Sequence, residues 1–303
     1  MSITVERIGA QPAWVPASQY PFQYRSLPVD GGRMHYIDEG EGEPIVFLHG
    51  TPTWSFIFRH LIRGLHREYR CIAPDMIGFG LSEKPPHWSY SPLDQARNLG
   101  MLVDHLSLDK FTLVMHDYGA AVGTTYAVDH PDRIKRMVVM NGACWSMHDD
   151  PHAHRIARIA SGVGGRMLLT NFTNWAKIVR RTFGDRSKFT ETFEKAIAGP
   201  TLNKEDRIGI WLTAKALGTS ASFLDDVWKR RKQMADLPFQ FIWGMRDPLY
   251  GEKCLNKWWQ GFPLCPVERL ASAGHFPMEE KPADVLEAVR EFMRAPINVS
   301  YLG

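Results

Sequence analysis

Short runs of apolar, β-branched residues alternate with longer amphipathic stretches through the first half of the chain. Runs of the first kind are typical of buried strands, and the amphipathic stretches are typical of helices that cover a sheet. The pattern predicts strands at 44–48, 70–73, 111–115 and 136–140, with helices between them at 53–67, 91–106 and 120–130. We expect this βαβα alternation to form a parallel sheet with helices on both faces.

The alternation stops near Cys144 and resumes at Pro238. Helix-like segments without a convincing strand fill the stretch between these points, and strands at 238–243 and 267–270 and a final helix at 282–294 follow it. The simplest architecture is a mostly parallel α/β sheet built from both ends of the chain, with an inserted helical cap. We therefore predict a core domain of residues 1–144 and 232–303 and a cap of residues 145–231.

An aspartate occupies the junction between a predicted strand and the helix after it, in the segment MHDYGA at 115–120. Such a strand–turn–helix junction is typical of a nucleophile elbow, which holds its central residue, here Asp117, at the carboxyl edge of a sheet. The sequence contains no G-x-S-x-G, so a serine hydrolase has no obvious nucleophile. Taken alone, the segment also fits an aspartate that only caps the helix.

Two later residues complete a possible catalytic triad. Asp247 follows one predicted strand in WGMRDP, and His275 follows the next in AGHFP. The order nucleophile, acid, histidine is that of the α/β-hydrolases, and open α/β sheets bind their ligands at the carboxyl ends of strands. We therefore expect Asp117 to be the nucleophile, His275 the base and Asp247 the acid that orients it. Asn141 also follows a strand, but it carries no charge.

Two loops complete the predicted edge of the sheet. The loop HGTP at 49–52 is expected to supply one backbone N–H of an oxyanion hole, and Tyr118 the other. Asp75 lies in the turn-rich loop after the next strand, and we interpret it as a structural turn or cap residue.

Composition and charge exclude several classes of function. The chain has 303 residues, of which 44% are apolar and 23% charged, and its formal charge of +3 is too small to indicate nucleic acid or an anionic membrane as a partner. No apolar run approaches the roughly 20 residues of a membrane span, and the first residues do not resemble a secretory signal. The four cysteines show no CxxC pairing, which favours a reducing cytoplasm.

One cluster contains residue types that bind metals: His148, Asp149, Asp150, His152 and His154. Its spacing matches no zinc pattern, so we interpret it as a solvated turn. We predict neither a metal nor a cofactor.

With these residues in hand, the chain resembles the haloalkane dehalogenase branch of the α/β-hydrolases. The matching segments span nearly the whole predicted sheet domain: HGTPTWSFIFRHLI from His49, IAPDMIGFGLSEKP from Ile72, VMHDYGAAVG from Val114, RMVVMNGAC from Arg136, WGMRDPLYG from Trp243 and AGHFPMEEKP from Ala273. The resemblance implies an α/β-hydrolase fold and hydrolysis of a small apolar substrate in two steps. Asp117 would displace a leaving group and form an ester, which water activated by His275 would release.

The expected leaving-group site departs from the pattern of this branch. Its dehalogenases usually hold the halide with a tryptophan after the nucleophile and a donor from the third position of the HGxP loop or from a cap tryptophan. These two positions are Tyr118 and Thr51 here. We assign the oxyanion and leaving-group pocket to Thr51, Tyr118, Trp54 and Trp175, with Trp145 as a further candidate.

Other substrates stay open. Epoxide hydrolases of related sequence use cap tyrosines, but this chain has no tyrosine between Tyr126 and Tyr250. Fluoroacetate dehalogenases resemble D-R-G-x-R at the elbow, and DYGAA at 117–121 lacks both arginines. Hydrolysis of an ester, a β-lactone or an epoxide is the alternative activity. A non-catalytic ligand-binding protein on the same fold is the alternative from another class, and a complete triad argues against it.

Overall fold

A computed structural model describes residues 6–7, 12–146, 159, 162–172 and 175–297. In these residues one sheet has the strand order β1-β2-β3-β5-β4-β6-β7-β8-β9. The strands are β1 (Glu6–Arg7), β2 (Arg25–Val29), β3 (Gly32–Glu39), β4 (Glu43–Leu48), β5 (Tyr69–Pro74), β6 (Phe111–His116), β7 (Ile134–Met140), β8 (Phe239–Gly244) and β9 (Val267–Leu270). From β5 to β9 along the sheet all pairs are parallel, whereas β1, β2 and β3 add antiparallel strands at one edge.

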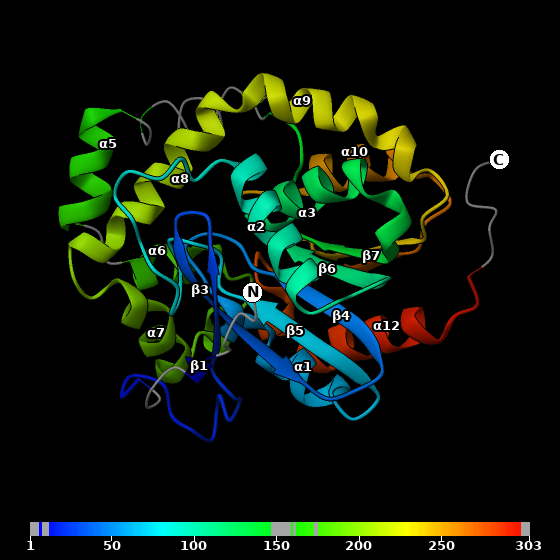
Figure 1. Ribbon diagram of the computed structural model, residues 1–303, viewed down its shortest axis with the longest axis horizontal. Helices are drawn as coiled ribbons and strands as arrows, with labels where there is room; N and C mark the ends of the chain where they lie inside the picture. The colour runs from blue at the N-terminus through cyan, green and yellow to red at the C-terminus, as the bar shows by residue number, and fades with distance from the viewer. Residues whose placement is uncertain (1–5, 8–11, 147–158, 160–161, 173–174, 298–303) are drawn as a thin grey trace.

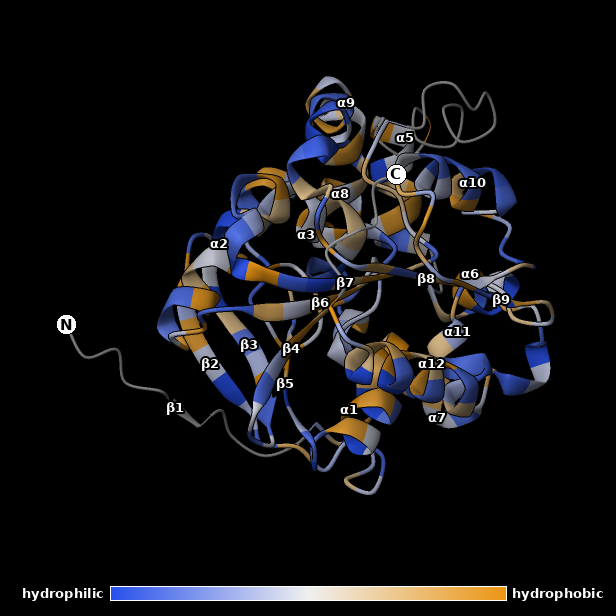
Figure 2. Ribbon diagram, turned by 90° about the vertical axis from the view of Figure 1, so that its right-hand side faces the viewer, coloured by the Kyte–Doolittle hydropathy of each residue, from blue (hydrophilic) through white to orange (hydrophobic). Residues whose placement is uncertain are grey.

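Helices cover both faces of the sheet, as the alternating pattern predicts (Figure 2). One face carries α2 (Pro92–His105), α3 (Tyr118–Asp129) and α10 (Glu252–Gly261), and the other carries α1 (Arg59–Leu65) and α12 (Pro282–Arg294). Successive strand residues point to opposite faces and so belong to different apolar cores. Along β6, Leu113 and Met115 pack in the core under α2 and α3, while Val114 packs in the core under α1 and α12.

The described residues between β7 and β8 form helices and turns. They include α5 (Val163–Met167), α6 (Trp175–Thr182), α7 (Glu191–Ala198), α8 (Ile208–Thr219) and α9 (Ala221–Lys229). Figure 1 shows α8 and α9 running along the top of the molecule and α5 at its upper left. The exact division into core and cap stays a prediction.

The structure differs from the predicted elements most clearly at the helix expected at 53–67 and at the antiparallel edge of the sheet. The helix expected at 53–67 begins as a 3₁₀ turn, η1 (Ser55–Phe58), and α1 follows from Arg59. The antiparallel hairpin of β2 and β3 was not predicted, although Asp30-Gly31 between two strand-like runs is a strong hairpin signal. Gly31 and Gly32 adopt φ values of 85° and 137°, which the turn requires.

Candidate active site

Asp117 stands at a strained turn between β6 and α3. Its φ of 51° and ψ of −121° lie outside the backbone regions that residues other than glycine usually adopt. Backbone strain of this kind costs about 1–3 kcal/mol and is found mostly at functional sites. The turn packs tightly against the neighbouring strand, because a Cβ on Gly119 would lie 2.2 Å from the Leu48 carbonyl oxygen. The Asp117 side chain makes no cap hydrogen bond within the described helix, so the geometry is not that of a helix-capping aspartate.

Backbone N–H groups hold the buried Asp117 carboxylate. Thr51 N donates to its Oδ2 at 2.8 Å, and the neighbouring N–H of Tyr118 also stabilises the charged form of this carboxylate. Burial raises the pKa of Asp117, while nearby His275 and these N–H donors act in the opposite direction. The two predicted oxyanion donors therefore meet at the predicted nucleophile.

The Thr51 loop is itself fixed by His49. Met76 N donates to His49 Nε2 at 2.9 Å, so His49 Nδ1 carries the proton that is donated to Gly50 O, also at 2.9 Å. Burial lowers the pKa of His49, which keeps this ring neutral.

His275 and Asp247 form the second part of the site. His275 Nδ1 lies 2.9 Å from Asp247 Oδ2, and both side chains are almost completely buried. Burial alone would lower the pKa of His275, but the charge of Asp247, aided by Asp117 and Glu280, raises it above the ordinary value. The ring is thus suited to accept a proton at Nε2 while Asp247 holds Nδ1–H.

Asn141 supports the acid. Its Nδ2 donates to Asp247 Oδ2 at 2.9 Å, and its Oδ1 accepts from Gly244 N at 2.8 Å. Leu249 N donates to the other carboxylate oxygen, Asp247 Oδ1, at 2.8 Å. Both oxygens of the acid are therefore fixed by hydrogen bonds, which orient it toward His275.

The His275 loop is bound to residues of the predicted cap. His275 N donates to Thr182 O at 2.9 Å. Glu280, in the short helix α11 (Pro277–Glu280), accepts from Gly274 N and from Asp185 N, each at 2.8 Å. The buried Glu280 carboxylate thus joins the loop before His275 to Asp185, which follows α6.

His116, next to the nucleophile, was not predicted to have a role. Its Nε2 donates to His275 O at 2.7 Å, and the two rings lie 4.6 Å apart. Burial, together with the charge of His275, holds the pKa of His116 well below its usual range. It is therefore a neutral ring that supports the base.

The predicted leaving-group residues divide into two groups. Thr51 Oγ1 and Trp175 Nε1 are buried and have no hydrogen-bond partner among the described residues. Two other predicted donors are already used: Trp54 Nε1 donates to Ala196 O, and the Tyr118 hydroxyl donates to Tyr90 O, both at 2.9 Å. The structure thus does not offer the Trp54 and Tyr118 side chains as donors near Asp117.

Trp145 likewise lies in an aromatic cluster. Its ring is 4.7 Å from that of Trp228 and 5.3 Å from that of Trp258, and Lys257 lies over it at 4.6 Å. These contacts are those of a packing residue.

Tyr250 lies beside the nucleophile and the base, and the sequence analysis missed it. Its ring stacks on His275 with centroids 5.8 Å apart and 20° between the planes, and its hydroxyl lies close enough to the Asp117 carboxylate for each group to shift the pKa of the other. Burial and the charge of Asp117 raise the pKa of Tyr250 well above its usual range, so it keeps its proton. Its place three residues after Asp247 is the signal that could have found it.

Asp75 links two loops by hydrogen bonds, which agrees with its interpretation as a structural turn or cap residue. Its Oδ1 accepts from Ser55 N at 2.9 Å, and its Oδ2 accepts from Leu81 N and lies beside His35 Nδ1, each at 2.8 Å. These bonds tie the start of η1 to the loop after β5.

The remaining predictions concern metals and membranes. The cluster from His148 to His154 lies outside the described residues. Within the part that the structure describes, no group of three or more histidine, cysteine or acidic side chains could hold a metal ion. In that same part, every helix is too short or too polar to cross a membrane.

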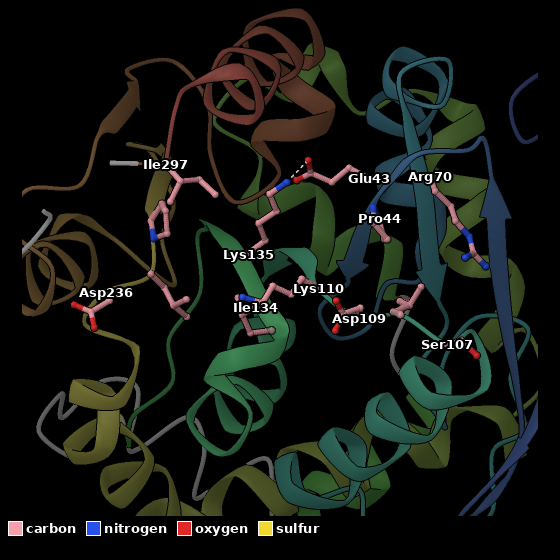
Figure 3. A pocket seen from close by; sticks show the side chains of 13 residues that line it. Glu43, Pro44, Arg70, Ser107, Asp109, Lys110, Ile134, Lys135, Asp236 and Ile297 are labelled. Carbon is pink, nitrogen blue, oxygen red and sulfur yellow. Dashed lines mark hydrogen bonds and ion pairs between the residues drawn. The ribbon is translucent and has the colours of Figure 1, made fainter. Parts of the chain in front are cut away.

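A groove of about 670 Å³ lies away from these residues, at the amino ends of β4 to β8 (Figure 3). Glu43, Arg70 and Lys135 line it, and an ion pair joins Lys135 to Glu43. The triad instead gathers at the opposite edge, after the last residues of β6, β8 and β9.

Comparison with known proteins adds independent information. The alpha/beta hydrolase fold family matches residues 43–282. Haloalkane dehalogenase 2 of Mycobacterium tuberculosis is 32% identical over 276 residues, which cover 90% of this chain and 95% of that protein. The chain belongs to the haloalkane dehalogenase-like branch of the α/β-hydrolase family.

Two further similar proteins widen the comparison. A cis-3-alkyl-4-alkyloxetan-2-one decarboxylase of Shewanella oneidensis is 31% identical over 284 residues, which cover 90% of this chain and 89% of that protein. The crystal structure of haloalkane dehalogenase DatA from Agrobacterium tumefaciens is similar with a TM-score of 0.79 and 25% identity, covering 91% of this chain and 97% of that chain. The comparisons confirm the fold and the hydrolase class and leave the reaction open.

Proposed function

We propose that this α/β-hydrolase cleaves its substrate through a covalent ester on Asp117. One observation carries the proposal: the strained elbow presents a buried carboxylate to two N–H donors, beside a histidine that a second carboxylate orients. In the first step an Asp117 oxygen attacks an electrophilic carbon in-line and displaces the leaving group. Because Asp117 is only 4% exposed, the substrate must leave most of its water behind to reach it.

The second step releases the product. His275 takes a proton from water, which attacks the carbonyl carbon of the Asp117 ester. The Thr51 and Tyr118 N–H groups stabilise the oxyanion that forms there. Collapse of the intermediate expels the product oxygen, which takes the proton from His275, and restores the Asp117 carboxyl group. Asp247 stabilises the imidazolium meanwhile.

The substrate we propose is a small apolar molecule attacked at carbon, as in a haloalkane dehalogenase. Thr51 Oγ1 and Trp175 Nε1 support a leaving-group site, since both are buried polar atoms that lack a partner among the described residues. A β-lactone is a second candidate substrate, because one relative is named as an oxetan-2-one decarboxylase.

The test uses a variant that forms the ester but cannot release it. His275→Phe removes the base, so a true substrate should add its alkyl or acyl mass to the protein. The variant would be exposed to haloalkanes, epoxides, esters and β-lactones, and its intact mass measured. We expect an adduct that maps to Asp117 and is absent when Asp117→Asn is added. Turnover by wild-type protein without any adduct in His275→Phe would contradict the covalent mechanism.

A further inference from the structure

A pocket of about 570 Å³ lies beside the loop that carries the base, and three arginines line it. Arg181 lies near the end of α6 and Arg186 follows that helix, while Arg246 comes from the loop after β8. Ser272 lines the pocket from the loop that leads to His275. None of the three triad residues lines it, so the pocket is distinct from the catalytic site.

The three arginines are exposed, and their charges are not balanced. Within the described residues, none of these side chains forms an ion pair or a hydrogen bond. Asp185 is the one acid among the described residues that line the pocket, and its carboxylate accepts from Ser187 N at 3.0 Å and from Ser187 Oγ at 2.6 Å. Because a guanidinium keeps its proton in a protein, the pocket has an excess of positive charge.

The groove at the amino ends of β4 to β8 shows the contrast. Its lining has three basic side chains and also three acidic ones, and an ion pair joins Lys135 to Glu43. The charges of that groove therefore balance among themselves. A concave site that gathers arginines without matching acids instead attracts an anion.

The backbone around the arginines is already held in place. Arg246 N donates to Ala273 O at 2.9 Å, which joins the loop after β8 to the loop before His275. Gly184 packs on this same loop so closely that a Cβ on it would lie 2.6 Å from Gly274 N. The three segments of the pocket are thus fixed to one another, and an anion would have to order only the arginine side chains.

We propose that this pocket is a second binding site, which takes a small free anion with more than one phosphate group, such as a diphosphate. A guanidinium donates two parallel N–H bonds to a pair of phosphate oxygens, and several such groups suit an anion whose oxygens are spread over more than one phosphorus. The bound anion would link the segment after α6 to the loops after β8 and before His275, so it stabilises the folded protein. This binding does not depend on the proposed reaction.

Isothermal titration calorimetry with inorganic pyrophosphate tests the site, in buffer without divalent cations. Sodium chloride at matched ionic strength is the reference, because salt alone screens exposed charges. We expect saturable binding at one site in each chain, and a higher thermal unfolding midpoint in pyrophosphate than in the reference. Arg186→Gln combined with Arg246→Gln should weaken binding by about tenfold or more, since charge-assisted hydrogen bonds are lost.

The matched control is Lys229→Gln combined with Lys232→Gln. It removes the same charge from the densest basic run of the chain and should leave the affinity for pyrophosphate nearly unchanged. Absence of pyrophosphate binding, or an equal loss of affinity in both double variants, would overturn the proposal.

Vesicles that contain phosphatidic acid separate a lipid headgroup from a free anion. Vesicle binding that is lost in the arginine variant, without binding of free pyrophosphate, would also overturn the proposal and make a lipid headgroup the ligand. Thermal unfolding without ligand checks that each variant is folded. The single variant Arg186→Gln, which lies outside the catalytic loops, carries the same test if the double variant is unfolded.

Discussion

The base side and the leaving-group side of this site are built differently. On the base side, hydrogen bonds occupy both oxygens of Asp247, and the His275 loop is held by Thr182 and Glu280. On the leaving-group side, Thr51 Oγ1 and Trp175 Nε1 are buried without a partner among the described residues. The first region is complete in itself, while the second has polar atoms that a bound molecule could satisfy.

The base side is therefore expected to determine the reaction mechanism, and the leaving-group side to determine which substrate binds. Proton transfer and ester hydrolysis require a fixed geometry, and the paired groups around His275 supply it. We expect substrate choice to depend on the unpaired donors of the leaving-group side, Thr51 Oγ1 and Trp175 Nε1. A family resemblance therefore predicts the reaction class better than it predicts the molecule that reacts.

The largest loss of activity should come from Asp117→Asn. This variant removes the proposed nucleophile, on which both steps of the reaction depend. The amide is nearly isosteric but a poor nucleophile, so kcat should fall by at least about 10⁴-fold. The thermal unfolding midpoint should change little, because the backbone N–H donors can still bond to the amide oxygen. Intact mass must exclude deamidation back to aspartate. Normal turnover by a variant whose mass shows no deamidation would remove Asp117 from the mechanism.

Asp247→Asn tests the base side alone. The amide favours the wrong tautomer of His275, and the ester-hydrolysis step should slow by about 10⁴-fold while ester formation is affected far less. Rapid-quench mass spectrometry of the ester separates the two steps. Asp129→Asn, a surface change at an ion pair with Arg230, is the matched control.

Asp247→Asn should also change how the rate of ester hydrolysis depends on pH. His275 acts only when neutral, and Asp247 raises its pKa, so the hydrolysis rate should rise with pH through a value above the ordinary 6.5. Removing the Asp247 charge should move this acid limb to lower pH. An unchanged limb in Asp247→Asn would assign the titration to another group.

Halide release by wild-type protein and by variants with altered donors tests the leaving-group side. Loss of one preorganised donor typically costs about 2.7–4 kcal/mol, so wild-type protein should release chloride poorly and iodide best from matched haloalkanes. Tyr118→Trp, and more so Thr51→Asn with Tyr118→Trp, should raise chloride release. Efficient chloroalkane turnover by the wild type, with no gain in the variants, would show that another pair of donors exists.

The smallest effect on activity should come from Gly274→Ala. This change disturbs the packing of the loop before His275 and leaves the catalytic side chains in place. The new Cβ would lie 2.3 Å from Gly184 N and from Thr182 O, both backbone atoms that have little room to move. Overpacking of this kind costs about 1–3 kcal/mol of unfolding free energy. Chemical denaturation measures the loss, and an equally stable variant would mean that the two segments separate easily.

Much of the site could be predicted because its residues follow strands. Asp117, Asp247 and His275 come directly after β6 and close after β8 and β9, and parallel strands bring their carboxyl ends to one edge. Their meeting needs only the strand order. The hairpin of β2 and β3 escaped prediction because its antiparallel strands lie outside the βαβα alternation, although its turn carried a clear signal.

The pocket could not be predicted in the same way. Trp54 donates to a carbonyl 142 residues away, and Tyr118 to one 28 residues away, so their side chains are fixed by long-range packing that no local pattern contains. Tyr250 was missed because the expected place for a tyrosine was the cap. The cytoplasmic location and the boundaries of the cap stay predictions.

A single turnover in oxygen-18 water tests the covalent route most directly. With protein in excess over substrate, water attacks the carbonyl carbon of the Asp117 ester, and its oxygen stays on the carboxylate. We predict that the label appears in the peptide that contains Asp117 and that the product of the first turnover carries none. Label in that first product, with an unlabelled Asp117, would mean that water attacks the substrate directly and that Asp117 is not the nucleophile.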